Sequence, residues 1–336
     1  MPAAQAKAHS ADLVVAEADG TDDALHLHRL ALWAQRRYAP LVAADPPDGL
    51  VLDVTGAAHL RGGEGALLAD MVQRLGQAGV CARAAMAGTW GAAHALARYG
   101  PWPTITVAND AVADALAALP VSALRLDADI TTALGKIGID KIGELEATPR
   151  APLALRFGSE LMRRLDQAFG RTAEPIEPVE APQLIQVRRA FAEPIGAPET
   201  LARYTLKLVE ALCQALEAKG LGARTLDLRF HRVDNRMEAI RVSMAAAVRD
   251  VRRLTRLLCD RLETIDPGFG VETMVLAAPV TEPLTPKGVA NDLIDAATPD
   301  ISDLVDALAN RAGAHRLYRQ APAQSDVPEQ IGRAHV

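Results

Sequence analysis

The sequence predicts an α+β protein built from two or three domains. Three patterns support this class: a turn followed by a β-prone apolar run at Leu50–Val54, an almost wholly helical stretch over residues 112–169, and a β-α-β-β-α-β order over residues 184–278. The chain has 336 residues, 49% of them hydrophobic, so each part can bury a core. Aromatic residues make up only 4%, so we expect aliphatic cores.

The composition argues against several classes of protein. A net charge of −6 gives no overall case for nucleic-acid binding, so local charge must be considered. The cysteines Cys81, Cys213 and Cys259 lie far apart, which argues against structural zinc and against a disulfide framework. The sequence has no apolar run of the roughly 18–20 residues that span a membrane and no recognisable signal peptide. We expect a cytoplasmic protein without membrane contact.

Residues 1–103 are assigned to a first domain. Thr21 is expected to cap a helix over Asp22–Arg37. The strand at residues 50–54, the helical pattern after it and a further strand at Val80–Met86 predict a βαβ-type unit.

The stretch Asp45–Glu64 indicates a site or the remains of one. It opens with a turn made of two prolines, Asp48 and Gly49. Asp53 then lies inside the apolar run, where a carboxylate is costly unless it is paired or bound to something.

Residues 104–172 are expected to form a helical domain. The sequence LGKIGIDKIGEL at residues 134–145 predicts two short helices joined by a tight glycine turn. Such a turn can present backbone N–H groups to a DNA phosphate, as a helix–hairpin–helix does, and an ordinary αα-hairpin is the alternative. The DNA-binding residues would be Lys136, Gly138, Lys141 and Gly143.

A linker rich in proline and glutamate, residues 173–183, leads to a domain over residues 184–280. Its element order is that of the ferredoxin-like split motif. The expected strands are Leu184–Phe191, Arg224–Val233, Glu238–Met244 and Val271–Ala278, and the expected helices are Pro198–Lys219 and Val248–Thr264. Residues 281–336 form a tail with one amphipathic helix at Ile301–Ala312.

Positive charge gathers in this domain. Residues 183–280 hold 15 Lys and Arg against 12 Asp and Glu, a net charge of +3 that leaves −9 for the rest of the chain. Alternation along the strands predicts one buried face and one wet face, and arginines on strands could track DNA phosphates. The candidates are Arg188, Arg189, Arg229 and Arg241, and an ordinary solvated face is the alternative.

Residues 46–56, PPDGLVLDVTG, resemble the third palm motif of the Y-family translesion DNA polymerases, a strand of the form S-x-D-E-A-x-L-D-V-T-G. The metal-binding Asp of that motif falls on Asp48, and its neighbouring catalytic Glu falls on Gly49. Phosphoryl transfer needs carboxylates that hold two divalent ions, and glycine removes one of them. The resemblance therefore implies a vestigial site at Asp48 and Gly49, with no catalytic residue, no metal and no cofactor. The following palm helix carries lysines in active members, whereas this chain has Gly91, His94 and Arg98 there.

The combination WAQRRYAPLVAADPPDGLVLDVTGAAHLRGGE is similar to the ImuB type of this family, as are residues 156–170 and 308–319. The resemblance implies a partial, ferredoxin-like palm, a helix–hairpin–helix thumb and a little finger in the three domains above. It also implies a non-catalytic adaptor of damage-induced (SOS) mutagenesis, associated with the nucleoid. Its partners would be damaged primer–template DNA, an ImuA-like protein, an error-prone replicative-type polymerase and the sliding clamp.

Other interpretations stay open. An active Y-family polymerase would use Asp48 and Asp53 as ligands for Mg²⁺, and a helix–hairpin–helix scaffold unrelated to polymerases would lack the six-element domain. The segment nearest to a clamp-binding peptide, Lys287–Ile294, lacks the usual glutamine and aromatic residue.

Both ends of the chain are expected to be incomplete. In Y-family proteins a palm strand with the first metal-binding Asp lies upstream of the matching region. At the other end, Gln330–Val336 can be back-translated into a common sequencing-library adapter, so we expect residues 331–336 to be non-native.

Overall fold

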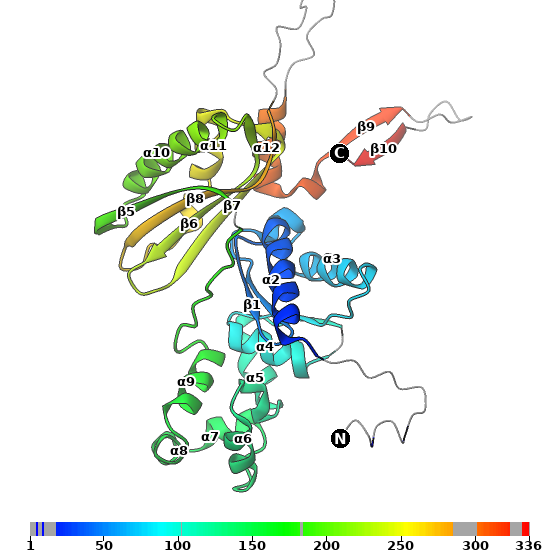
Figure 1. Cartoon of the computed structure of the whole chain (residues 1–336), viewed down its shortest axis with the longest axis vertical. Coiled ribbons are helices and arrows are strands. Elements are labelled where there is room, and N and C mark those ends of the chain that lie inside the picture. Colours follow the sequence, from blue (N-terminus) through cyan, green and yellow to red (C-terminus); the bar gives the residue numbers. More distant parts are fainter. Residues whose placement is uncertain are drawn as a thin grey trace, which may run out of the picture.

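A computed structural model describes residues 18–101, 103–181, 184–284, 301–322 and 331–335, together with Gln5 and His9. These residues form three regions, each with a hydrophobic cluster of its own. The N-terminal region lies between a helical region and a region built on a four-stranded sheet (Figure 1). None of the described helices combines the length and the apolarity needed to cross a bilayer. The clamp-like segment at residues 287–294 lies outside the described residues.

The N-terminal region places two helices, α2 and α3, against an antiparallel hairpin of β1 and β2. In the hairpin, Leu41 pairs with Asp53 and Asp45 pairs with Gly49, so the turn contains Asp48. A second, parallel pair, β3 and β4, is connected through α4. The elements are α2 (Gly20–Arg37), β1 (Leu41–Asp45), β2 (Gly49–Asp53), η1 (Ala58–Arg61), α3 (Glu64–Gln77), β3 (Ala84–Met86), α4 (Trp90–Tyr99) and β4 (Thr104–Thr106).

Two details of this region differ from the sequence prediction. The first helix caps on Asp19 and not on Thr21, because the Asp19 carboxylate accepts the backbone N–H groups of Thr21 at 3.0 Å and Asp22 at 3.1 Å. The predicted βαβ unit is wrong in its pairing, since the strand at residues 50–54 pairs with β1. The parallel unit is β3–α4–β4.

The helical region confirms the helical pattern expected over residues 112–169. Its core is aliphatic and also receives the alanines of α4. The elements are η2 (Asn109–Ala111), α5 (Val112–Ala117), η3 (Val121–Leu124), α6 (Ala128–Gly135), α7 (Ile142–Ala147), α8 (Arg150–Phe157) and α9 (Ser159–Ala168).

The sheet region has the predicted β-α-β-β-α-β order. Its strands are arranged β5-β8-β6-β7 and each neighbouring pair is antiparallel, so each βαβ unit is split by one intervening strand. Helices α10 and α11 cover one face (Figure 1). The elements are β5 (Ile185–Ile195), α10 (Pro198–Glu217), β6 (Leu221–Arg232), β7 (Met237–Val248), α11 (Val251–Cys259), η4 (Leu262–Thr264) and β8 (Val271–Pro283).

Helix α12 (Ser302–Ala312), the predicted C-terminal helix, lies along the outer edge of β7. The amide of Asn310 accepts the N–H of Ser243 at 2.8 Å and donates to its carbonyl at 2.6 Å, as a neighbouring strand would. Asp306 accepts the N–H of Ala245 at 2.8 Å. The helix therefore satisfies backbone groups that an edge strand normally leaves open. The chain continues through η5 (Ala314–Arg316) to an antiparallel hairpin of β9 (Tyr318–Pro322) and β10 (Ile331–His335).

The N-terminal region contacts the sheet region directly. Gly56 has φ +74°, and a Cβ there would lie 2.7 Å from the Ala239 carbonyl oxygen of β7, so only glycine permits this approach. His59 lies in η1, and the distance from its Nε2 to Arg261 Nη2 is 2.5 Å. The predicted linker is held as well, because Val179 donates its N–H to Val42 of β1 at 2.8 Å.

We expect acid to weaken this contact. Burial, followed by the charge of Arg261, lowers the pKa of His59 from 6.5 to about 4. In the folded protein His59 stays neutral, whereas the unfolded chain takes up a proton below about pH 6.5. Stability is therefore full above that pH and falls as the pH drops towards 4. Because the ring is only half-buried, we expect a loss of about 1 kcal/mol between pH 7 and pH 5.

Urea unfolding at the two pH values measures this loss. His59→Gln should flatten the pH dependence relative to the parent chain. His26→Gln, which replaces an exposed histidine on α2, is the matched control, and the effect of His59→Gln is judged against it. Identical slopes in the parent and His59→Gln would contradict the assignment.

Candidate functional site

The turn between β1 and β2 carries two carboxylates, and α4 supplies a basic side chain to each. His94 and Arg98 lie one helical turn apart and therefore share a face of α4. His94 Nδ1 lies 2.9 Å from Asp45 Oδ2, and the pair is mostly buried. Arg98 forms an ion pair with Asp48 at the surface, in which Nη2 donates to Oδ1.

These two side chains favour the ionised form of both carboxylates. Burial acts to raise the pKa of Asp45, but the hydrogen bond with His94 and the charges of His94 and Arg125 outweigh it, and the pKa is lowered. The pKa of Asp48 is lowered chiefly by its hydrogen bond from Arg98. The carboxylates of this turn are therefore engaged by side chains of the same chain, Asp48 in an ion pair with Arg98 and Asp45 in a hydrogen bond with His94.

The residues of the turn do not fit a two-metal site. A Cβ at Gly49 would lie 2.9 Å from the Asp45 carbonyl oxygen, so the glutamate of the polymerase motif has no room without a shift. Asp53 accepts the N–H of Thr55 at 2.9 Å, a local turn contact. Among the described residues, no group of three or more His, Cys, Asp or Glu side chains could hold a metal ion. A two-metal mechanism needs such a cluster.

The glycine turn of residues 136–141 joins α6 and α7 as predicted. Gly138 has φ +79°, a conformation that favours glycine, and lies exposed with Lys136 and Lys141, whereas Gly143 is half-buried. The Glu144 carboxylate accepts the N–H groups of Asp140 at 2.9 Å and Lys141 at 3.0 Å. These two donors are already used, so the exposed lysines are the groups best placed for a phosphate.

Two of the four arginines predicted on the strands are not on a wet face. Arg188 and Arg189 are exposed on β5, but Arg241 is 2% exposed and Arg229 is 3% exposed. Arg241 forms two hydrogen bonds with the fully buried Asp227, opposite it on β6. We therefore correct the assignment of Arg229 and Arg241 to DNA. Both are enclosed, so a phosphate cannot reach them in this arrangement.

The surroundings of Arg229 indicate what covers this face of the sheet. Burial lowers its pKa, and the charges of Asp227 and of Glu180 in the linker oppose that effect. The linker runs close to the sheet, since Ala181 lines a cavity together with Ala278 and Pro279 of β8. Polar and apolar residues do alternate along the strand, but the polar side chains face another part of the same chain and not water.

A groove lined by arginines lies at the junction of α2 with the sheet, and the sequence did not predict it. Its walls hold Arg29, Trp33, Arg36 and Arg37 from α2, Arg61 from η1 and Arg224 from β6, which together define the arginine groove. The α2 residues follow helical spacing and lie on one face. That stripe was visible in the sequence, but the opposite wall comes from a strand almost 190 residues later.

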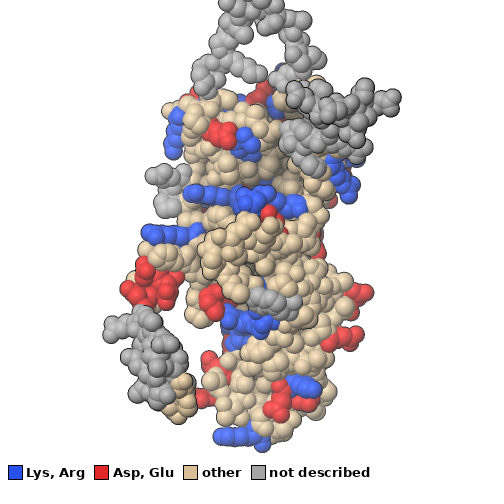
Figure 2. All heavy atoms as spheres, turned by 90° about the vertical axis from the view of Figure 1, so that its right-hand side faces the viewer, with Lys and Arg blue, Asp and Glu red and all other residues tan. Residues whose placement is uncertain are grey.

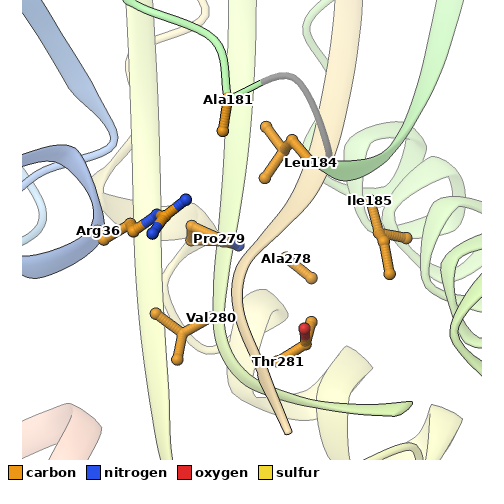
Figure 3. A pocket seen from close by; sticks show the side chains of 8 residues that line it. All are labelled: Arg36, Ala181, Leu184, Ile185, Ala278, Pro279, Val280 and Thr281. Carbon is orange, nitrogen blue, oxygen red and sulfur yellow. The ribbon is translucent and has the colours of Figure 1, made fainter. Parts of the chain in front are cut away.

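The arginine groove has a volume of about 690 Å³. A neighbouring cavity of about 510 Å³ shares Arg36 and Val280 with it. Figure 3 shows Arg36 pointing from α2 towards Pro279 of β8, with Ala181 and Leu184 above them and Ile185 on the side away from Arg36. On the face shown in Figure 2, Lys and Arg side chains form a band across the middle of the molecule.

Comparison with known proteins identifies the family. The profile of the impB/mucB/samB family C-terminal domain matches residues 182–279. Protein ImuB of Caulobacter vibrioides, strain NA1000/CB15N, is 44% identical over 329 residues, which cover 97% of this chain and 71% of that protein. The same values hold for Protein ImuB of strain CB 15 of that species.

Solved structures show a weaker likeness. A ternary complex of Dbh aligns over 82% of this chain and 83% of its own, with 13% identity and a TM-score of 0.43. DinB from Sulfolobus solfataricus aligns over 83% and 82%, with 14% identity and a TM-score of 0.42. The assignment rests on the sequence relatives: this chain belongs to the ImuB family within the Y-family DNA polymerases, the proteins of translesion synthesis.

Proposed function

We propose that this protein is a non-catalytic adaptor of translesion synthesis, which binds damaged primer–template DNA and brings an error-prone polymerase to it. The observation that carries the proposal is the pairing of Asp48 with Arg98 and of Asp45 with His94. In a nucleotidyltransferase the corresponding turn holds divalent cations that activate the primer end. Here Arg98 and His94 occupy the two carboxylates, and Gly49 supplies no side chain.

The proposed DNA contacts come from two regions. The helical region would act as the thumb, with Lys136, Gly138, Lys141 and Gly143 beside the phosphate backbone. The sheet region would act as the little finger through Arg188 and Arg189 on its exposed edge strand. Such contacts to the backbone fix position and do not depend on base sequence.

An adaptor also needs protein partners. Membership of the ImuB family supports an ImuA-like protein, an error-prone replicative-type polymerase and the sliding clamp. The clamp-like segment at residues 287–294 is outside the described residues, so we assign no residue to a clamp contact.

We expect purified protein to bind primer–template DNA and to add no nucleotide with either Mg²⁺ or Mn²⁺. Gel-based primer extension tests the catalytic part. Asp48→Ala should leave both binding and the absence of extension unchanged, since Asp48 serves an exposed ion pair. Incorporation by the parent protein that is lost in Asp48→Ala would overturn the non-catalytic assignment.

Fluorescence anisotropy at several salt concentrations tests the binding part. Lys136→Glu/Lys141→Glu should weaken duplex binding at least tenfold and reduce the salt slope by about 1.8, at about 0.9 for each phosphate that the variant no longer neutralises. Lys219→Glu, an exposed lysine at the end of α10, is the control and should bind like the parent. An unchanged slope in the double variant would remove the helical hairpin from the DNA interface.

A further inference from the structure

We propose that the arginine groove is a second nucleic-acid site, which binds single-stranded DNA through its phosphates and stacks a base near Trp33. The groove lies between α2 and the sheet, in a different part of the chain from the glycine turn of α6 and α7. It is therefore separate from the duplex contacts proposed for Lys136 and Lys141. The choice of DNA over another polyanion rests on the proposed function.

The positive charge of the groove exceeds the negative charge of the carboxylates near it. Arg29 and Arg36 are exposed, and no acidic side chain pairs with them in the described part of the chain. Arg37 Nε is buried without a hydrogen bond, because Asp70 lies 3.6 Å away and also pairs with Arg74 at 2.9 Å.

Arg61 and Arg224 add to this charge. Arg61 donates a hydrogen bond to the Arg37 carbonyl oxygen at 2.8 Å. A carbonyl oxygen carries no net charge, so this contact does not neutralise the Arg61 guanidinium. Its pKa is lowered by burial and then by the charge of Arg37. Arg224 has one carboxylate nearby, Glu282 at 3.3 Å. Crowded guanidinium groups of this kind gain by taking up an anion, and their planar forks match phosphate oxygens.

The apolar part of the wall favours a single strand over a duplex. Trp33 is half-buried against Tyr38, with ring centroids 5.5 Å apart, and lines the groove beside Leu32 and Val280. A duplex presents its backbone and keeps its bases stacked inside. A single strand offers both phosphates and base faces, and aromatic side chains between cations are the usual way to bind it. Arg29 and Arg36 lie seven residues apart on α2, about 10 Å along the helix axis, so they can contact different phosphates of one strand.

The test compares binding of fluorescein-labelled oligo-dT with binding of a duplex of equal length, each over a range of salt. Arg29→Ser/Arg36→Ser should weaken oligo-dT binding about tenfold and lower its salt slope by about 1.4, at about 0.7 for each phosphate of a single strand. Duplex binding should change less than twofold. Arg203→Ser/Arg252→Ser, which removes two exposed arginines from α10 and α11, is the matched control and should bind oligo-dT like the parent.

A second variant tests the stacking contact and does not depend on charge. Trp33→Leu should weaken oligo-dT binding about tenfold at an unchanged salt slope, since stacking releases no counterions. Circular dichroism of each variant confirms that the fold is retained. Arg29→Lys/Arg36→Lys should keep the salt slope of the parent.

Three outcomes would overturn the proposal: unchanged oligo-dT binding in Arg29→Ser/Arg36→Ser, an equal loss of duplex binding, or competition by poly-glutamate as effective as that by unlabelled oligo-dT. The last would identify an acidic peptide as the better occupant. The glycine-turn variant Lys136→Glu/Lys141→Glu separates this site from the proposed duplex interface. If this variant loses duplex binding but keeps oligo-dT binding, the result supports two sites. If the parent protein binds no duplex at all, the proposed function fails, but the oligo-dT comparison still tests the groove.

Discussion

Replacing Asp227 with alanine is expected to destabilise the sheet region by about 3–5 kcal/mol. Asp227 is fully buried and holds Arg241 through two hydrogen bonds, at 2.7 Å to Nε and 2.6 Å to Nη2. The alanine variant leaves the guanidinium charge enclosed without a counterion. Arg241 Nη1 already lacks a hydrogen-bond partner, so the remaining contacts cannot compensate.

Thermal and urea unfolding followed by far-UV circular dichroism measures this loss, since residues 184–284 contain no tryptophan. Glu282→Ala, which breaks the exposed pair with Arg224, is the matched control and should change stability by less than about 1 kcal/mol. Asp227→Leu/Arg241→Met removes both charges and should recover most of the loss. If Asp227→Ala cost no more than Glu282→Ala, the buried pair would not have the structural role assigned to it.

The second large effect concerns the docking of α12. Asp306 is fully buried, accepts the N–H of Ala245 at 2.8 Å and pairs with Arg253 at 2.5 Å. Asp306→Ala should weaken this docking by about 3 kcal/mol, because it leaves the Ala245 N–H without its acceptor and removes the buried carboxylate that pairs with Arg253. Amide hydrogen exchange at Ser243 and Ala245 should then accelerate at least a hundredfold.

Asp303 gives a matched control for this change. It contacts the same Arg253 at 2.5 Å, but its side chain is 56% exposed. Asp303→Ala should therefore change the exchange of these amides less than fivefold. Equal acceleration in the two variants would mean that charge near Arg253, and not the buried contact, holds the helix.

Most of the secondary structure could be predicted because the periodicity of apolar residues is a local signal. The six-element order of the sheet region and the helices over residues 112–169 follow from it directly. Strand β1 was missed because its sequence, LVAAD, is short and three of its five residues have weak β-propensity. The pairing of β2 was therefore also wrong.

Tertiary burial could not be predicted in the same way. Along β6, Asp227 and Arg229 alternate with Leu226 and Leu228, and this pattern is the same whether the polar face meets water or another region of the chain. Only the packed structure, with the linker near Arg229, decides between the two.

The candidate site was predictable in part. The motif resemblance located Asp48 and Gly49, but the ion pair of Asp48 with Arg98 joins residues 50 positions apart in sequence. The arginine groove likewise combines a helix stripe with Arg224 from a distant strand. Spacing along one element indicates which side chains share a face, and it does not show what that face meets.

Because α12 lies along β7, the two edges of the sheet differ in how many backbone groups they can offer to another chain. The Asn310 amide already occupies the backbone groups of Ser243 on β7. At the opposite edge, β5 pairs only with β8 among the described strands. Among the described residues, β5 is therefore the edge that favours a partner which binds by adding an extended segment to this sheet. There the new strand would meet Arg188 and Arg189, so an acidic segment is favoured over a basic one.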